Sequence, residues 1–254
     1  MQESSSTGGS ESRHGLPPSP PLLPPDPRAV DGRVRADMLD AGYEIRECYR
    51  VLEKAGLNVV GEVLRGQGEF IEMEHYPTDD VLDRDTHSQY YYHAHRGARD
   101  EHGHFHTFIR TGELPERIPP FDYPQASESW PHEGDAVAHL VGIAMDDWGY
   151  PTGLFATNRW VTGETWYPAE SVIDLLPCFA IDHAYPSWPV NRWITAMLRL
   201  FRPHIQALLR HRDETVAAWQ AAAPGQDVFE DRRLEITGYI PISVDAWLAQ
   251  LAES

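Results

Sequence analysis

The feature that most constrains the fold is a set of strand-like runs that follow one another through short links. Residues 90–96 and 102–110 are joined by the turn-like stretch GARDEH. Residues 136–145 and 152–161 are joined by DDWGYP, whose Asp, Gly and Pro are typical of a tight connection. Parallel strands need a long crossover connection, whereas antiparallel strands need only a turn. These links therefore predict an antiparallel sheet.

Helical and further strand patterns come before these runs. An amphipathic helix is expected over residues 33–55, with Asp31 as its N-cap. Residues 68–77 alternate in polarity as a strand does, and Pro77 is expected to end that strand. The acidic stretch 78–85 is interpreted as a solvated loop, because it lacks the glycine and the terminal glutamate of an EF-hand loop.

A long helix is expected over residues 187–223, kinked or divided at Pro203. Its apolar stripe contains Trp193, Met197, Leu200, His204 and Leu208. A strand over residues 233–242 and a short helix over 244–251 complete the chain. This order of elements predicts an α+β fold, with a mainly antiparallel sheet of about five to seven strands and helices packed on one face.

The first 30 residues are expected to form a disordered tail. Stretches such as SSSTGGSES and PPSPPLLPPDP offer little apolar surface to bury. Residues 31–254 are then expected to form a single α+β domain, for which the 41% hydrophobic content of the chain supplies a full core. The sequence has neither a run of eighteen apolar residues nor a basic and then apolar leader, so a cytoplasmic protein is expected.

The charge of the chain argues against two classes of partner. The sequence has 39 acidic and 21 basic side chains, which gives a formal net charge of −18. Such a charge repels phosphate backbones and anionic lipids, so we expect neither nucleic-acid binding nor membrane binding. Cys48 and Cys178 lack CxxC spacing and are expected to be buried thiols rather than metal ligands.

Histidines gather in the first pair of runs, in the segment YYYHAHRGARDEHGHFHTF. Because side chains two residues apart in a strand point the same way, His93 and His95 share one face. His104 and His106 share one face of the next strand by the same rule. The expected register sets His93 opposite His106, and His95 then lies opposite His104.

Four imidazoles on one face favour a metal site. His93, His95, His104 and His106 are the expected ligands, with His75 and His139 as additional ones. Imidazole nitrogen suits zinc, iron, copper and nickel, and the ligand set does not discriminate among these ions. The alternative interpretation is a solvated strand face on which the histidines have no chemical role.

Three other residues are candidates for catalysis. Glu72 and Glu101 are carboxylates that could transfer a proton. Arg159 could anchor a substrate carboxylate, although a structural ion pair explains it equally well. In the second pair of runs, the expected register places His139 opposite Asn158 and would extend the polar site into the sheet.

Known motifs narrow the function only by exclusion. The sequence lacks HExxH, a phosphate-binding glycine loop, a GxSxG elbow and paired cysteines. The stretch HAHRGARDE is similar to the first cupin motif, but Glu101 stands too far from His95. Ala156 stands where the second cupin motif has its metal histidine, so a cupin is not expected.

The stretches YYHAHR, EHGHFHTF, NRWVTGE and PVNRW resemble an uncharacterised bacterial family that is defined only as a domain of unknown function. The resemblance covers roughly residues 38–211 and leaves out the tail. It implies that the histidine hairpin is a feature of the family, and it brings no activity or ligand with it.

Two functions remain open on the sequence. The first is a metalloprotein that binds one divalent transition metal through the histidine face. The second is a scaffold, or a module that binds a small ligand without a metal, and has no catalytic activity. A small-molecule ligand fits both functions, and the sequence decides neither the reaction nor the oligomeric state.

Overall fold

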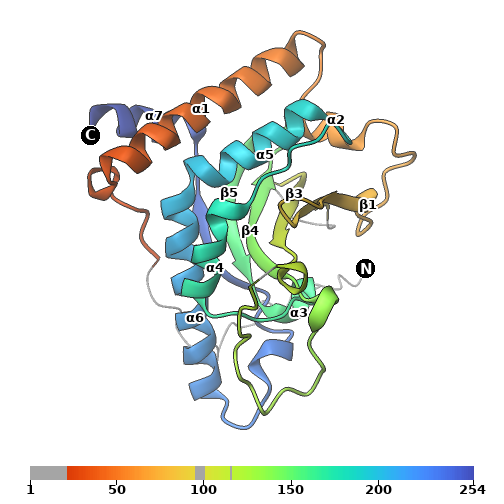
Figure 1. Ribbon diagram of the computed structural model, residues 1–254, viewed down its shortest axis with the longest axis vertical. Coiled ribbons are helices and arrows are strands. Elements are labelled where there is room, and N and C mark those ends of the chain that lie inside the picture. The colour runs from red at the N-terminus through yellow and green to blue at the C-terminus, as the bar shows by residue number, and fades with distance from the viewer. Residues whose placement is uncertain (1–21, 95–100, 115) are drawn as a thin grey trace, which may run out of the picture.

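A computed structural model of the protein describes residues 22–94, 101–114 and 116–254. Its centre is a six-stranded sheet in which the strands lie side by side in chain order (Figure 1). The strands are β1 (Tyr76–Asp83), β2 (Ser88–His93), β3 (Gly103–Ile109), β4 (Ala138–Met145), β5 (Pro151–Thr157) and β6 (Ile236–Pro241). Every neighbouring pair is antiparallel, which confirms the predicted fold class.

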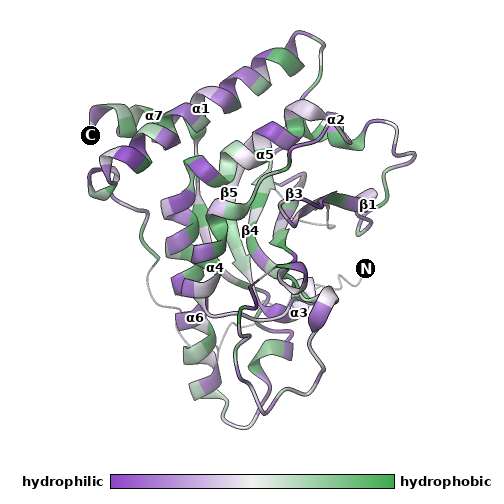
Figure 2. Ribbon diagram, in the orientation of Figure 1, coloured by the Kyte–Doolittle hydropathy of each residue, from purple (hydrophilic) through white to green (hydrophobic). Residues whose placement is uncertain are grey.

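Helices form a layer on one face of this sheet (Figure 1). They are α1 (Gly32–Glu53), α2 (Val59–Leu64), α4 (Ala169–Leu175), α5 (Trp188–Leu200), α6 (Arg202–Ala222) and α7 (Val244–Glu253), whereas the short α3 (Arg159–Thr162) contributes no residue to the core beneath this layer. α4 and α6 contact the sheet, whereas α1 packs against α5 and α7. Figure 2 shows that the central strands β4 and β5 are mostly apolar, while the outer helix α1 carries many polar residues.

The two faces of the sheet differ in chemistry. On the helix face, the Tyr90 hydroxyl donates a hydrogen bond of 2.6 Å to Asn191 of α5. The Phe105 ring lies 5.4 Å from the Trp193 ring of the same helix. Because side chains alternate along a strand, the residues between these aromatic positions point away from the helices. The opposite face therefore carries the histidines of β2 and β3.

The structure corrects the prediction of a strand over residues 68–77. The strand β1 instead begins at Tyr76, includes Pro77 and runs through most of the acidic stretch that was expected to be a loop. Asp83 explains this outcome, because its carboxylate accepts backbone N–H groups from Asp85 and Thr86 and so builds the turn after β1. An acidic side chain here organises the backbone and is not merely solvated.

The second hairpin also ends earlier than expected. Gly142 pairs with Phe155 and Ala144 with Gly153, which is the expected register of β4 and β5. The strand stops at Thr157, however, and Asn158 caps α3 by accepting the Arg159 backbone N–H. The expected pairing of His139 with Asn158 is therefore not formed.

Other sequence expectations can be compared directly with the structure. The long helical region divides at Phe201 into α5 and α6, with Pro203 in the first turn of α6, as predicted. Cys48 is buried as expected, but Cys178 is exposed. Leu22 and Val30 pack against the main core, so the packed part of the chain begins before residue 31.

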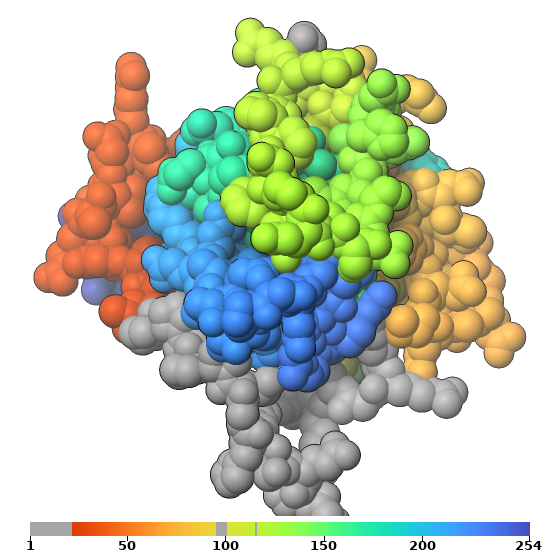
Figure 3. All heavy atoms as spheres, turned by 90° about the horizontal axis from the view of Figure 1, so that it is seen from below, coloured from red at the N-terminus to blue at the C-terminus, as the bar shows by residue number. Residues whose placement is uncertain are grey.

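A smaller core lies at the far end of α6. It is formed by Trp166, Val216, Trp219, Val228, Phe229 and Leu234. Figure 3 shows that the segment between β3 and β4 lies beside the end of α6 and the residues after it. Tyr123 donates a hydrogen bond to Gln220 there, and the Ser127 hydroxyl donates one to Asp227. In the described residues, no helix has both the length and the apolar character needed to cross a bilayer.

Candidate metal centre

The hairpin of β2 and β3 brings three of the predicted histidines together. His93 pairs with His104, and Tyr91 pairs with His106. The expected register, with His93 opposite His106, is therefore wrong by two residues. A shift of two residues keeps every side chain on its original face, so the three histidines still share one face. His95, the fourth predicted ligand, lies outside the described residues.

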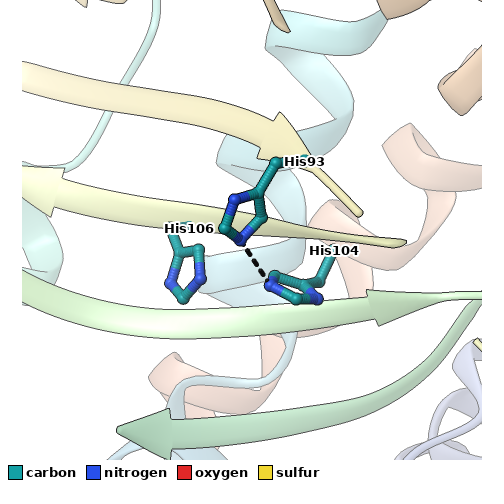
Figure 4. Close-up of side chains that lie close together, drawn as sticks. All are labelled: His93, His104 and His106. Atoms are coloured by element: carbon teal, nitrogen blue, oxygen red, sulfur yellow. Dashed lines mark hydrogen bonds between the residues drawn. The ribbon is translucent and has the colours of Figure 1, made fainter. Parts of the chain in front are cut away.

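The three imidazoles converge on one point, as Figure 4 shows. One nitrogen from each of His93, His104 and His106 lies within 4.8 Å of the other two. Their relative exposures are 7%, 7% and 1%, so water competes weakly for these nitrogens. Nε2 of His93 lies 2.7 Å from Nε2 of His104. This arrangement can hold a metal ion.

Glu101 orients His104. Its carboxylate accepts a hydrogen bond from Nδ1 of His104 across a very short contact. In the neutral ring, that donation leaves Nε2 of His104 with a lone pair, and the proton shared with His93 then belongs to His93. A carboxylate that fixes the tautomer of a histidine is a frequent partner of metal ligands.

His139 orients His106 from β4. Nδ1 of His106 lies 3.0 Å from Nε2 of His139. Burial lowers the pKa of His139 to about 3, and burial also lowers the pKa of His106 well below its usual value, so both rings are neutral near pH 7. A hydrogen bond to the Val141 backbone raises the pKa of His139, as expected when the single ring N–H of His139 is the donor. His106 therefore donates through Nδ1 and keeps the lone pair on Nε2.

Nε2 of His106 is the atom that the local structure leaves unexplained. It is fully buried and has no hydrogen-bond partner among the described residues. A buried polar atom without a partner costs about 1–3 kcal/mol of stability. Because Nδ1 faces His139, Nε2 is the nitrogen that His106 can offer to an ion held together with His93 and His104.

A pocket of about 240 Å³ opens onto two of these imidazoles, those of His104 and His106. Its lining consists of Glu101, Gly103, His104, His106, Phe155, Thr157, Val161, Glu235, Ile236 and Tyr239. The Phe155 ring lies edge-on to His104, with 5.1 Å between centroids. The cluster therefore faces a space large enough for a small molecule.

Two of the other predicted site residues, His75 and His139, lie beside this cluster. The His75 ring stacks on Tyr91 at 3.6 Å and hydrogen-bonds Asp80, and its centroid is 5.8 Å from that of His93. His139 contacts His106 rather than the point where the three ligand nitrogens meet. Glu72 lies in an exposed turn before β1.

Arg159 is engaged elsewhere. It is 5% exposed, forms an ion pair with Glu230 and lies 5.5 Å from the centre of the Trp130 ring. This placement matches the structural alternative that the sequence left open for this residue.

Sequence reasoning missed the walls of the pocket. Phe155 and Tyr239 come from β5 and β6, which are far apart in the sequence. The one local signal was a glycine in each of two neighbouring strands, Gly142 and Gly153, because glycine inside a strand often marks a close approach by another group. Their partners follow only from the strand register.

A buried carboxylate lies next to the cluster and predicts a pH effect. Glu164 is 0% exposed and accepts the His139 backbone N–H at 2.8 Å. Burial raises the pKa of Glu164 to about 7, despite the attraction of Arg212 and Arg159. Because the folded pKa lies above the usual 4.5, the protonated form stabilises the fold below pH 4.5, and this contribution is lost as the pH rises to about 7.

We expect the Glu164→Gln variant to lack this loss. The wild-type protein should lose about 3 kcal/mol of unfolding free energy between about pH 4.5 and pH 7 relative to the variant. Urea unfolding at a series of pH values measures the difference, with the exposed Glu253→Gln as the control. Parallel pH profiles for wild type and Glu164→Gln would show that Glu164 ionises normally.

Comparison with known proteins assigns a family but no activity. No curated protein matches the chain, and no solved structure matches it. The sequence of residues 39–242 matches the family described as Domain of unknown function (DUF6969). This match extends beyond residue 211, where the resemblance seen in the sequence motifs ended. The chain therefore belongs to the DUF6969 family.

Proposed function

We propose that the protein binds one divalent transition metal ion through His93, His104 and His106. The observation that carries this proposal is the buried Nε2 of His106, which lacks a described hydrogen-bond partner and belongs to a ring with a nitrogen within 4.8 Å of a nitrogen of each of the other two histidines. A metal ion would satisfy that atom and use the lone pair that Glu101 reserves on His104.

The geometry needs only a small adjustment to hold an ion. Ligand nitrogens around a tetrahedral zinc ion lie about 3.3 Å apart, because each zinc–nitrogen bond is about 2.0–2.1 Å long. Nε2 of His93 and Nε2 of His104 are 2.7 Å apart and share a proton. Binding would require the proton of neutral His93 to move from Nε2 to Nδ1, and would separate the two nitrogens by about 0.6 Å.

Three protein ligands leave room for a further ligand on the pocket side. Catalytic zinc sites have three protein ligands and an open position, whereas structural sites are closed by four. When bound, a metal ion at such a site acts as a Lewis acid and lowers the pKa of a ligating water molecule. Glu101 would act as a positioning residue here, because its carboxylate is already bonded to His104.

Calorimetric titration of the untagged protein tests the proposal. We expect one zinc or cobalt ion per chain in the wild-type protein. The His106→Ala variant should lose at least about 100-fold in metal affinity, because it removes a ligand and also frees His139. His132→Ala is the matched control, since His132 is exposed and should leave the affinity unchanged.

A metal-free function competes with this one, and the 2.7 Å contact between His93 and His104 favours it. The hydrogen bond between the two imidazoles satisfies both Nε2 atoms without an ion. The pocket beside them could then bind a small ligand in the absence of a metal. Wild-type protein that is folded and takes up no metal in the same titration would support this second function and overturn the first.

A further inference from the structure

Two glycines shape the wall of the pocket beside the histidines. A Cβ atom on Gly142 would lie 2.3 Å from the Phe155 ring, and one on Gly153 would lie 2.0 Å from the Tyr239 hydroxyl oxygen. Both rings therefore occupy space that a side chain would otherwise fill, and they lie across the neighbouring strand. The result is an aromatic wall along β4, β5 and β6.

This wall leads directly to the proposed ligands. The Phe155 ring contacts His104 and His106, with centroids 5.1 and 5.6 Å apart. Val161 and Ile236 extend the apolar surface, and Tyr239 stands 47% exposed at the opening. A flat apolar molecule in the pocket would place one end at the imidazoles and its ring against Phe155 and Tyr239.

The charge around the pocket selects against anions. The charged side chains that line it, among the described residues, are the two carboxylates Glu101 and Glu235, and neither Lys nor Arg accompanies them. The whole chain adds a net charge of −18. An aromatic carboxylate would approach acidic groups without meeting a cation other than the ion itself.

We propose that this pocket binds a small, flat, uncharged heteroaromatic molecule that ligates the metal ion through a neutral nitrogen, and that it excludes aromatic carboxylates of the same size. The inference rests on the proposed function, because the nitrogen of the molecule would bind the proposed metal ion. The aromatic wall and the acidic lining supply the selectivity.

Cobalt-loaded protein allows a direct test with two probes of matched shape. 4-Methylpyridine is neutral at about pH 7.5, whereas 4-methylbenzoate is an anion. Calorimetry first establishes cobalt uptake, and the visible absorption of the ion then reports each probe. The measured quantity is the affinity for 4-methylpyridine divided by the affinity for 4-methylbenzoate. We expect this ratio to be about 10-fold or more higher for the cobalt-loaded protein than for free cobalt ions.

Variants separate the two causes of selectivity. Tyr239→Ala should lower the affinity for 4-methylpyridine about 5-fold, because the ring contact is lost, and should leave the affinity for cobalt unchanged. Glu235→Gln should raise the affinity for 4-methylbenzoate several-fold, because it removes a repelling charge. Glu253→Gln, at the exposed end of α7, is the control and should leave that affinity unchanged. In Gly153→Val, the new side chain would push the Tyr239 ring aside. The affinity for 4-methylpyridine should therefore fall by as much as in Tyr239→Ala.

The outcomes distinguish the two proposals. Absence of cobalt uptake by folded wild-type protein overturns the metal site and this inference with it. Cobalt uptake with equal or tighter binding of 4-methylbenzoate overturns the inference alone. Cobalt uptake with unchanged 4-methylpyridine affinity in Tyr239→Ala and in Gly153→Val shows that the wall does not contact the ligand and overturns it as well.

Discussion

Excess zinc should raise the melting temperature of the protein strongly at about pH 7.5 and hardly at all at about pH 5. An ion at 1,000 times its dissociation constant stabilises the folded state by about 4 kcal/mol. For a chain of this size that corresponds to a rise of about 8–16 °C. Differential scanning calorimetry at the two pH values measures the effect.

The direction of the pH dependence follows from the protons that ligation displaces. A bound ion needs all of its ligating imidazoles neutral; burial already lowers the pKa of His106 well below the unperturbed value of about 6.5, and ligation imposes the same condition on the other ligands. Stability from a depressed pKa is present above the unfolded value and is lost as the pH falls through the depressed one. Acid should therefore release the ion and its stabilisation together.

The control for this experiment is the His93→Ala/His104→Ala double variant, which should show no zinc-dependent shift at either pH. A shift of equal size at both pH values in the wild-type protein would contradict the histidine site. It would instead indicate binding by the carboxylates Asp79, Asp80, Asp83 and Asp85.

Replacing Trp193 by alanine should cost about 4 kcal/mol of unfolding free energy, because a buried Trp→Ala change leaves a large cavity. Trp193 is 0% exposed, and its indole N–H donates a hydrogen bond of 3.0 Å to the Tyr49 hydroxyl. Its ring also supports Phe105, which lies between His104 and His106 on β3. The residue thus joins α1 and α5 to the strand that carries two proposed ligands.

Urea unfolding followed by circular dichroism measures this loss without relying on tryptophan fluorescence. Trp148→Ala is the matched control, since Trp148 is 76% exposed and its removal should change the unfolding free energy by less than about 0.5 kcal/mol. A loss below about 1 kcal/mol for Trp193→Ala would mean that the helix layer does not depend on this contact.

The sequence allowed the faces of the strands to be predicted better than their registers. His93, His104 and His106 share a face because of the two-residue period of a strand, which does not depend on the partner. The register of β2 and β3 depends on how the chain turns between them, and the pattern of residues did not determine it. The predicted register was therefore wrong by two residues. The three histidines still share one face, and only the residues that lie opposite one another differ from the prediction.

Element boundaries failed where side chains bond to the backbone. Asp83 uses its carboxylate to build a turn, and Asn158 uses its amide to begin a helix. Both residues also occur in solvated loops, so composition alone does not separate these roles. The pocket wall was beyond prediction for another reason, because Phe155 and Tyr239 join the histidines in one pocket only after four pairings align strands β2 to β6.

The order of the strands has a consequence for how the site forms. Because β2 and β3 are consecutive in the chain, their hairpin can close without a long-range pairing, whereas β5 and β6 are separated by helices α3 to α6. Hairpins form in about 1–10 μs, so His93, His104 and His106 can meet before the helices dock. An ion captured at that moment would hold β2 and β3 in their native pairing. The metal would then accelerate folding, and it would serve as a nucleus for the sheet as well as a ligand of the finished protein.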